Sequence, residues 1–374
     1  MGTIKAAIMH ERGGTEVPKM IESRPIRVPF RKIGRVLLAT VGFATFAQAQ
    51  PVPQVRAGNA VPVTADNFNR AETDMYFGKR VKKGDRIGNL SHSRELYLTD
   101  SPVVRPNRDT LYSGSVFDYD AGPVTITLPD AGTRFMSMQV IDEDQYTHAV
   151  YYGAGRFTMT REEMGTRYGS LVIRILANPQ EPEDMKQVHD LQDAIKVEQK
   201  SSGKYEAPNF DSVSQKKVRD ALLALGTTIL DNKRMFGDRS EVDPVRHLIG
   251  SAMLWGGLPE KDALYLNITP DNNDGATVYK LNVPDVPVDG FWSITVYNDK
   301  GYLEPNQYNA YSLNNITAKK NADGSVAVQF GGCDGKISNC LPTMAGWNYM
   351  VRLYRPRAEV LSGTWKFPEA QRVN

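Results

Sequence analysis

The sequence has few of the residues, and none of the short motifs, that mark the common enzyme classes. Only five of its 374 residues are histidine and only two are cysteine. Four scattered histidines, His92, His148, His189 and His247, follow the first fifty residues, so neither a histidine-rich metal centre nor a Ser-His-Asp triad is indicated. A G-x-S-x-G elbow, a Walker loop, a dinucleotide glycine fingerprint and an H-E-x-x-H helix are also missing. We therefore expect no metal and no cofactor.

The apolar run near the N-terminus is too short to cross a bilayer. It covers residues 36–46, about 11 residues where a spanning helix needs about 20. Basic residues precede the run and Ala47-Gln48-Ala49 follows it, which predicts a signal peptide over residues 1–49, cleaved near Ala49. A membrane anchor is the alternative interpretation, and the start is open between Met1 and Met20. We expect a periplasmic or secreted protein without a transmembrane segment after cleavage.

The chain shows no excess of positive charge once this leader is set aside. The formal net charge of the whole sequence is +2. Residues 1–49 hold eight Lys or Arg and three Asp or Glu, which leaves 37 basic and 40 acidic side chains in the rest. This balance does not resemble a nucleic-acid footprint, so we expect no nucleic-acid partner.

The two cysteines, Cys333 and Cys340, lie seven residues apart in a segment rich in Gly, Asp and Asn. In an oxidising compartment this spacing predicts a local disulfide. A metal half-site is the alternative, but the spacing matches no zinc pattern and no histidine is near.

Hydrophobic periodicity divides the rest of the chain. Residues 50–65 are rich in Pro, Val and Ala and predict a loose arm. Apolar residues alternate along segments such as 124–128 and 171–175, which predicts an N-terminal β module over residues 66–180.

The period changes to that of a helix in residues 181–260, the predicted helical linker segment. Met185, Val188, Leu191 and Ile195 share one face of a helix that begins behind Pro182. Leu222, Leu225 and Ile229 predict a second helix ending at Gly237.

Alternation returns in residues 261–374, the predicted C-terminal β-sandwich module. Asp274-Gly275 and Asp323-Gly324 predict hairpin turns. Along residues 291–297, Trp292 is in phase with the apolar face, whereas Tyr297 is out of phase with it. The fold class predicted is mainly β, with two antiparallel β-sandwich or jelly-roll modules linked by a helical segment.

The polar segment Asn107–Ser113 runs towards the alternating strand at residues 124–128 and is typical of a binding site. Two carboxylates at a suitable separation suffice for glycoside hydrolysis, which makes Asp109 and Asp142 candidate catalytic residues. The alternative is that such acids cap backbone N–H groups. Arg134 is expected to pair with Asp109 or Asp142, in a catalytic or a structural role.

Further side chains are candidates for ligand binding because they combine flat faces with hydrogen-bonding edges. Tyr297 and Tyr354 are favoured because they are out of phase with the apolar strand faces, whereas Trp292 is favoured as core. The candidates are Asn107, Arg108, Tyr112, Tyr146, Tyr297, Arg352 and Tyr354.

Two sets of residues resemble a known pairing of domains. The segment N-x-D-T-L-Y-S, with the Gly-Pro that follows it, resembles the domain of unknown function 1254. Trp255-Gly-Gly257, Tyr265, the segment 290–297 and Arg352-Leu-Tyr-Arg-Pro356 resemble the domain of unknown function 1214. The resemblance implies an exported bacterial protein with two β-rich modules, but no agreed reaction.

The chain departs from this family's pattern at two positions. His148 stands where an Asn is more usual, which adds His148 to the candidate ligand-binding residues, and Cys340 stands where Trp is frequent. We expect the protein to recognise or hydrolytically process an envelope or extracellular glycan. The alternative is a non-catalytic binding or assembly module. The expected partner is thus a glycan or another small polar ligand, and a homo-oligomer is left open.

Overall fold

The computed structural model describes residues 60–82, 87–98 and 104–373, which belong to one compact unit. The predicted signal peptide and residues 50–59 of the predicted arm lie outside the described residues. The described end of the arm is held by backbone hydrogen bonds between Val61 and the segment 209–211, both at 2.8 Å. Strand accounts for 29% of the structure and helix for 21%, which confirms the mainly β prediction.

The N-terminal module contains two antiparallel sheets. The larger has the order β1-β2-β7-β4-β5 and the smaller the order β6-β3-β8. The strands of the larger sheet are β1 (Ser91–His92), β2 (Thr110–Asp118), β7 (Tyr168–Leu176), β4 (Met136–Asp142) and β5 (Thr147–Tyr152). Those of the smaller sheet are β6 (Gly155–Met159), β3 (Val124–Leu128) and β8 (Lys196–Glu198).

Alternation explains how these two sheets pack. Val124, Ile126 and Leu128 of β3 are buried while the threonines between them are partly exposed. They share a core with Leu171 and Ile173 of β7, so each sheet contributes one apolar face.

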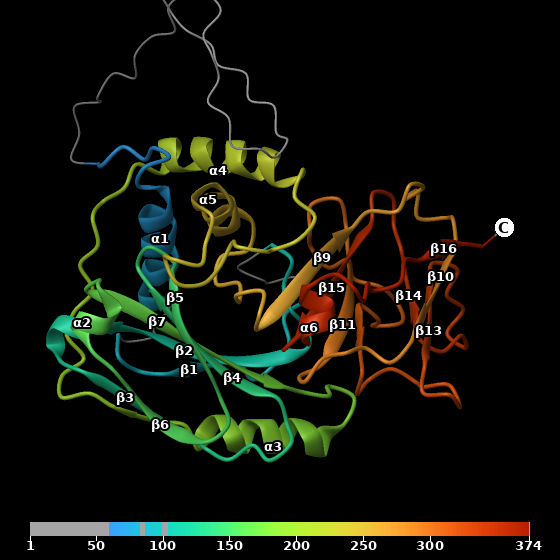
Figure 1. Cartoon of the computed structure of the whole chain (residues 1–374), viewed down its shortest axis with the longest axis horizontal. Helices are drawn as coiled ribbons and strands as arrows, with labels where there is room; N and C mark the ends of the chain where they lie inside the picture. Colours follow the sequence, from blue (N-terminus) through green and yellow to red (C-terminus); the bar gives the residue numbers. More distant parts are fainter. Residues whose placement is uncertain (1–59, 83–86, 99–103, 374) are drawn as a thin grey trace, which may run out of the picture. The chain divides into compact units, whose positions relative to one another are not determined.

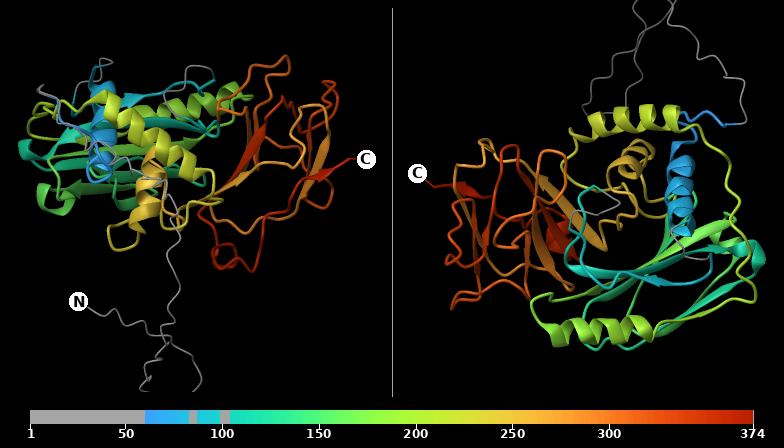
Figure 2. Two further views of the ribbon diagram at one scale, coloured as in Figure 1. Left: turned by 90° about the horizontal axis from the view of Figure 1, so that it is seen from above. Right: turned by 180° about the vertical axis from the view of Figure 1, so that it is seen from behind.

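Helices cover this module on both sides (Figures 1 and 2). Helices α1, α4 and α5 lie on one side of the larger sheet, and α3 lies on the opposite side, near β3 and β6. The helices are α1 (Phe68–Lys82), α2 (Arg161–Met164), α3 (Pro182–Asp193), α4 (Ser212–Gly226), α5 (Pro244–Met253) and α6 (Ala358–Leu361), with a short 3-10 turn at Tyr119–Ala121. In the part of the chain that is described, none of them combines the length and apolar character needed to span a membrane.

Residues 181–260 contain helices α3, α4 and α5 together with strand β8, and one predicted helix boundary is wrong. Helix α3 begins at Pro182 as predicted, with proline in its first turn. Helix α4 ends at Gly226, so neither Ile229 nor Gly237 belongs to it. Beyond its end, the hydroxyls of Thr227 and Thr228 donate to carbonyls three residues back, at 2.8 and 2.7 Å. This local bonding competes with further helical turns.

The C-terminal module is a sandwich of two four-stranded sheets, seen beside the N-terminal module in Figure 1. One sheet comprises β12 (Ser312–Asn314), β11 (Trp292–Tyr297), β15 (Asn348–Tyr354) and β9 (Ala263–Ile268), in that order. The other comprises β14 (Cys340–Leu341), β13 (Val326–Phe330), β10 (Tyr279–Val283) and β16 (Gln371–Arg372). The strands pair antiparallel except β13 and β14, which pair parallel.

Strand β11 is buried on both faces. Trp292, Ile294 and Val296 enter the core between the two sheets of the sandwich. Tyr297 enters a second core, which also contains Phe135 and Leu176 of the N-terminal module. The core assignment of Trp292 is confirmed, and the second core joins the modules.

The two predicted hairpin turns are tight turns, but they do not form hairpins. Gly275 and Gly324 adopt φ of +81° and +83°, as tight turns of this composition require. The turn at Gly275 connects β9 to β10, and the turn at Gly324 lies between β12 and β13. In both cases the flanking strands belong to different sheets. The turn chemistry was therefore predictable, whereas the pairing of the strands was not.

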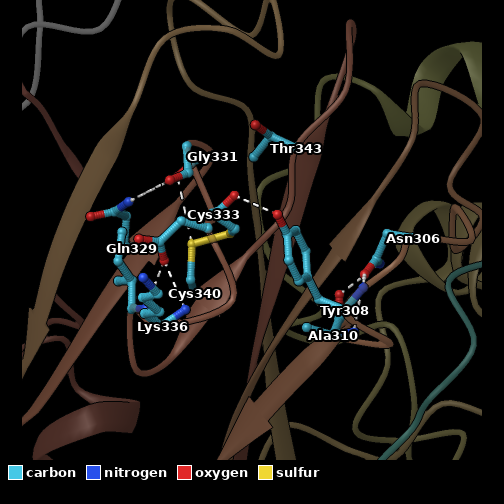
Figure 3. The surroundings of a disulfide bond; sticks show 12 residues. Asn306, Tyr308, Ala310, Gln329, Gly331, Cys333, Lys336, Cys340 and Thr343 are labelled. Atoms are coloured by element: carbon cyan, nitrogen blue, oxygen red, sulfur yellow. Dashed lines mark hydrogen bonds between the residues drawn. A yellow bond between two sulfur atoms is a disulfide. The ribbon is translucent and has the colours of Figure 1, made fainter.

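The predicted disulfide between Cys333 and Cys340 is confirmed. Their Cα atoms lie 5.7 Å apart, and the bond closes the loop between β13 and β14. Figure 3 shows Tyr308 beside this loop, where its hydroxyl donates to the Cys333 carbonyl at 2.7 Å. The disulfide thus fixes a loop that also contacts the segment before β12.

Candidate functional site

A cavity of about 180 Å³ lies where the two modules meet. Strands β2 and β7 of the N-terminal module contribute to its wall, as do β9 and β15 of the C-terminal module. Helix α1, the segment before β2, and the end of α5 with the segment after it complete the wall. Arginine and tyrosine dominate its polar side chains, and we call it the arginine–tyrosine cavity. These side chains are Tyr76, Arg80, Tyr97, Arg105, Asn107, Tyr112, Arg174, Tyr265, Arg352 and Tyr354.

Strand register places each buried arginine of this cavity beside a tyrosine. Tyr112 of β2 is the direct partner of Arg174 on β7. Tyr265 of β9 is the direct partner of Arg352 on β15. Tyr354 lies two residues beyond Arg352 and therefore on the same face of β15. The strands of each module thus present one buried arginine and at least one tyrosine.

Arg174 is held by neutral partners. Its side chain donates to Gln139 Oε1 at 2.9 Å and to the Gly256 carbonyl at 2.7 Å, and it lies 5.5 Å from the Tyr112 ring centroid. Burial tends to lower the pKa of Arg174, but the neighbouring tyrosines, Tyr112 foremost, raise that pKa above its ordinary value. In the described part of the chain it forms no ion pair with a carboxylate. Arg174 is thus a buried cation whose charge is not balanced by direct contact.

Arg352 is fixed in a similar way. It donates to Thr295 Oγ1 at 3.0 Å, to the Tyr297 hydroxyl at 2.7 Å and to the Arg105 carbonyl at 3.0 Å. Burial tends to lower the pKa of Arg352, while Tyr297 and Asp109 help to raise it above its ordinary value. The guanidinium is therefore charged at neutral pH, and its bonds tie β15 to the segment before β2.

Asn107 connects the tyrosines of the two modules. Its Nδ2 group lies 2.9 Å from the Tyr354 hydroxyl, 3.2 Å from the Tyr112 hydroxyl and 3.1 Å from Thr110 Oγ1. Its Oδ1 atom accepts from the Asp109 backbone N–H at 2.7 Å, so Asn107 forms an Asx turn. Asn107 therefore shapes its own loop and positions two phenols in the cavity.

The cavity is cationic and rich in hydroxyl donors. No Asp or Glu is found among the described residues that line it. Burial raises the pKa of Tyr265 and of Tyr354, so both phenols keep their protons at neutral pH. Guanidinium groups and phenol hydroxyls together suit an anionic ligand.

The structure brings four of the predicted site residues together in this cavity: Asn107, Tyr112, Arg352 and Tyr354. Tyr297 is fully buried behind Arg352 and donates its hydroxyl proton to the Pro106 carbonyl at 2.8 Å. Tyr297 thus supports the cavity from behind.

Asp109 is fully buried and does not line the cavity. Its Oδ1 atom accepts from Asn314 Nδ2 of the C-terminal module at 3.1 Å. Burial raises the pKa of Asp109, and the nearby charge of Arg352 opposes that rise. Asp109 thus joins the two modules at a position that a ligand in the cavity does not contact.

The expected pairing of Arg134 with Asp109 or Asp142 is wrong. Arg134 makes a two-pronged contact with Asp184 at the start of α3, at 2.5 and 3.1 Å. It also donates to the Leu176 carbonyl at 2.7 Å. Asp184 belongs to the first turn of α3, which places its carboxylate beside Arg134. Arg134 lines a separate surface pocket of about 730 Å³.

Asp142, Tyr146 and His148 form a separate cluster at the β4–β5 turn. Asp142 Oδ1 accepts from the backbone N–H groups of Asp144 and Tyr146 at 2.8 and 2.9 Å, and Oδ2 lies 3.0 Å from His148 Nε2. The Tyr146 ring stacks on His247 at 4.5 Å. None of these residues lines the arginine–tyrosine cavity. The alternative of backbone capping, considered from the sequence, describes Asp142.

Arg108 points away from the arginine–tyrosine cavity into a second one of about 270 Å³. Its guanidinium lies over the Tyr311 ring at 4.7 Å and donates to the Tyr97 carbonyl at 2.7 Å. Neighbours in sequence thus serve different cavities, because successive side chains of an extended segment point in opposite directions.

Sequence reasoning missed several residues of the site. Arg174 interrupts the apolar run of β7, and a lone arginine in such a strand was a usable signal. Trp255 and Tyr265 were noticed only as part of a family resemblance. Tyr76 of α1 and Arg105 gave no signal, since tertiary packing alone brings them to the cavity.

Comparisons with known proteins agree with the two-module architecture. The model described as Protein of unknown function (DUF1254) matches residues 87–199, and the model described as Protein of unknown function (DUF1214) matches residues 262–358. No curated protein matches the chain in sequence.

A solved structure with a TM-score above 0.5 shares the fold at low sequence identity. The crystal structure of the VPA0106 protein from Vibrio parahaemolyticus is 18% identical, with a TM-score of 0.64, over 82% of this chain and 98% of that one. An uncharacterized protein from Burkholderia cenocepacia is 12% identical, with a TM-score of 0.48, over 83% of this chain and 88% of that one. The two family matches together cover more than half of the sequence, in the expected order. The chain therefore belongs to the family in which a DUF1254 domain precedes a DUF1214 domain.

Proposed function

We propose that the protein binds a small organic anion in the arginine–tyrosine cavity. The observation that carries the proposal is the presence of Arg174 and Arg352 in one cavity without a described acidic side chain in its lining. Planar guanidinium groups suit carboxylates, which they bind through paired hydrogen bonds. A ligand carboxylate would supply the negative charge that the protein does not place there.

The size of the cavity restricts the ligand to about one ring. Its volume of about 180 Å³ is close to the roughly 150 Å³ that holds a benzene molecule in an engineered protein cavity. A polysaccharide chain does not fit in such a space. Of the glycan ligands expected from the sequence, only a single acidic sugar unit is therefore a candidate for this anion.

We assign binding rather than hydrolysis to this cavity. The two carboxylates considered for catalysis are engaged elsewhere, Asp109 with Asn314 and Asp142 with backbone N–H groups and His148. A hydrolytic pair would need both groups beside the bound sugar. The proposal accordingly falls in the non-catalytic binding class.

We also propose that the protein works outside the cytoplasm. The signal-peptide pattern of residues 1–49 supports this, as does the Cys333–Cys340 disulfide, because disulfides persist in oxidising compartments. Such a location would expose the cavity to small anions of the envelope or the medium.

Replacing Arg174 by glutamine should weaken binding of a small carboxylate by about 10- to 100-fold. The change removes one charge-assisted hydrogen-bond donor, worth about 1.5–3 kcal/mol. Isothermal titration of the wild-type protein with ring-sized and short carboxylates, and with their neutral amides, would measure the effect. The amides should not bind.

The matched control is Arg156→Gln, which removes an exposed arginine that pairs with Glu198 on the module surface. This variant should bind the carboxylates like the wild type. Arg174→Lys keeps the charge but lacks the planar guanidinium, so its affinity for the carboxylates should lie between those of the wild type and Arg174→Gln. Equal affinity of wild type and Arg174→Gln, or no binding by any carboxylate, would overturn the proposal.

A further inference from the structure

We infer that the ligand is an aromatic monocarboxylate, bound with its carboxylate inward and its ring against Trp255. The inference rests on the proposed function and narrows it, since it selects one class of anion. The evidence is the burial of Arg174 and Arg352, the fixed position of the indole and the hydrogen bonds that already engage the polar groups of the Trp-Gly-Gly turn.

The depth of the cavity orients the ligand. Arg174, Arg352 and Tyr354 are 5%, 3% and 1% exposed, so the cationic end is deep. Tyr76 and Trp255 also line the cavity and are partly exposed, as are Arg80 and Arg105. A carboxylate that contacts Arg174 and Arg352 therefore lies at the buried end of the cavity, and the body of the ligand then packs against the partly exposed Trp255.

The indole of Trp255 is a rigid wall. Tyr76 stacks on it with ring centroids 4.6 Å apart and an interplanar angle of 24°. Phe77 meets it edge-on at 6.1 Å, and the indole N–H donates to Thr73 Oγ1 at 3.1 Å. A ring held on several sides loses little conformational freedom when a ligand packs against it.

The glycines that follow Trp255 connect this wall to the cation. Gly256 has φ of +76°, a conformation that favours glycine, and its carbonyl accepts from Arg174 at 2.7 Å. A Cβ atom on Gly257 would lie 2.4 Å from the Phe236 ring, so that position also requires glycine. The Trp-Gly-Gly turn thus fixes the distance between the aromatic wall and the guanidinium of Arg174.

The indole N–H of Trp255 and the carbonyls of the two glycines after it are already engaged. The Gly256 carbonyl binds Arg174, the Gly257 carbonyl accepts from Gln139 Nε2 at 2.8 Å, and the Trp255 N–H binds Thr73. The apolar side chains of the cavity lining include Val172, Met253, Leu254 and Met350. A hydroxyl group buried there without a partner costs about 1–3 kcal/mol. An aromatic ring avoids that cost, whereas a sugar ring does not.

The test is a ranking of ligands with wild-type protein by isothermal titration. Benzoate should bind at least about tenfold more tightly than acetate and than glucuronate. Glucuronate binding more tightly than benzoate would overturn the aromatic assignment and leave the proposed anion site standing, with an acidic sugar as its ligand. Acetate binding as tightly as benzoate would overturn the assignment as well. Failure of every carboxylate would overturn the proposed function itself.

Variants locate the ring on the indole. Trp255→Leu should lower the affinity for benzoate by about tenfold. It should change the affinity for acetate by less than about threefold, because acetate does not reach the indole. Trp365→Leu is the matched control, since Trp365 is also partly buried but packs against the core of the C-terminal sandwich. It should leave both affinities unchanged. An equal loss for benzoate and acetate in Trp255→Leu would contradict the inferred orientation.

Discussion

Replacing Arg352 by methionine is expected to lower the free energy of unfolding by about 3–5 kcal/mol. Arg352 is 3% exposed and joins β15 to Thr295, to Tyr297 and to the carbonyl of Arg105. Its removal leaves these acceptors short of a donor and leaves the fully buried carboxyl of Asp109 without its nearby cation. Urea denaturation at pH 7.5 would measure the loss.

The free energy of unfolding that Arg352→Met loses should be smaller when Asp109 is neutral. In the Arg352→Met background, adding Asp109→Asn should recover part of the lost stability, because the buried group is then uncharged. Arg156→Met is the matched control, since its ion pair with Glu198 is exposed and should contribute at most about 1 kcal/mol. A loss below about 1 kcal/mol in Arg352→Met would show that Arg352 does not hold the two modules together.

Replacing Asp74 by asparagine should make the protein more stable at pH 8 than the wild type. Asp74 of α1 is 4% exposed and accepts a hydrogen bond from the Tyr205 hydroxyl at 3.2 Å. Burial, and next the charge of Glu143, raise the pKa of Asp74 to about 7. Asparagine has the same shape and keeps the acceptor oxygen, but it never becomes charged.

The sign of the effect follows from proton linkage. Between about pH 4 and pH 7 the folded wild type keeps the Asp74 proton while the unfolded chain has lost it. Stability therefore falls as pH rises through this window, by up to about 4 kcal/mol in total. Below pH 4 both states are protonated, and wild type and Asp74→Asn should be nearly equal.

Urea unfolding of both proteins from pH 4 to pH 8 would test this expectation, because their difference cancels the titration of other groups. Asp220→Asn provides the control, since Asp220 is exposed on α4 and pairs with Lys216. The free energy of unfolding of Asp220→Asn should change with pH in the same way as that of the wild type. A parallel profile for Asp74→Asn would mean that Asp74 is ionised in the folded protein.

Local sequence patterns were sufficient for much of the fold. Alternation along β3 and β11 predicted their strands, and the change of period predicted α3 from its proline onward. The close spacing of Cys333 and Cys340 predicted their disulfide. These features depend on residues near one another in sequence, where dihedral preferences and side-chain period act directly.

Features that depend on distant residues were not predictable. The pairing of Tyr112 with Arg174 is set by the register of β2 against β7, and the contact of Arg134 with Asp184 by the path of α3. Asn107 and Asp109 looked equivalent in sequence, yet one lines the cavity and the other is buried beside Asn314. Four of the predicted residues, Asn107, Tyr112, Arg352 and Tyr354, line the same cavity. Arg174 and Trp255, which also line it, were not among the candidates.

The most direct test of the anion site is a crystal structure of the protein grown with the carboxylate that binds most tightly in titration. We predict that its carboxylate contacts the guanidinium of Arg174 or Arg352 inside the arginine–tyrosine cavity. A ligand bound only in the pocket beside Arg134, or only on the exposed surface, would contradict this account.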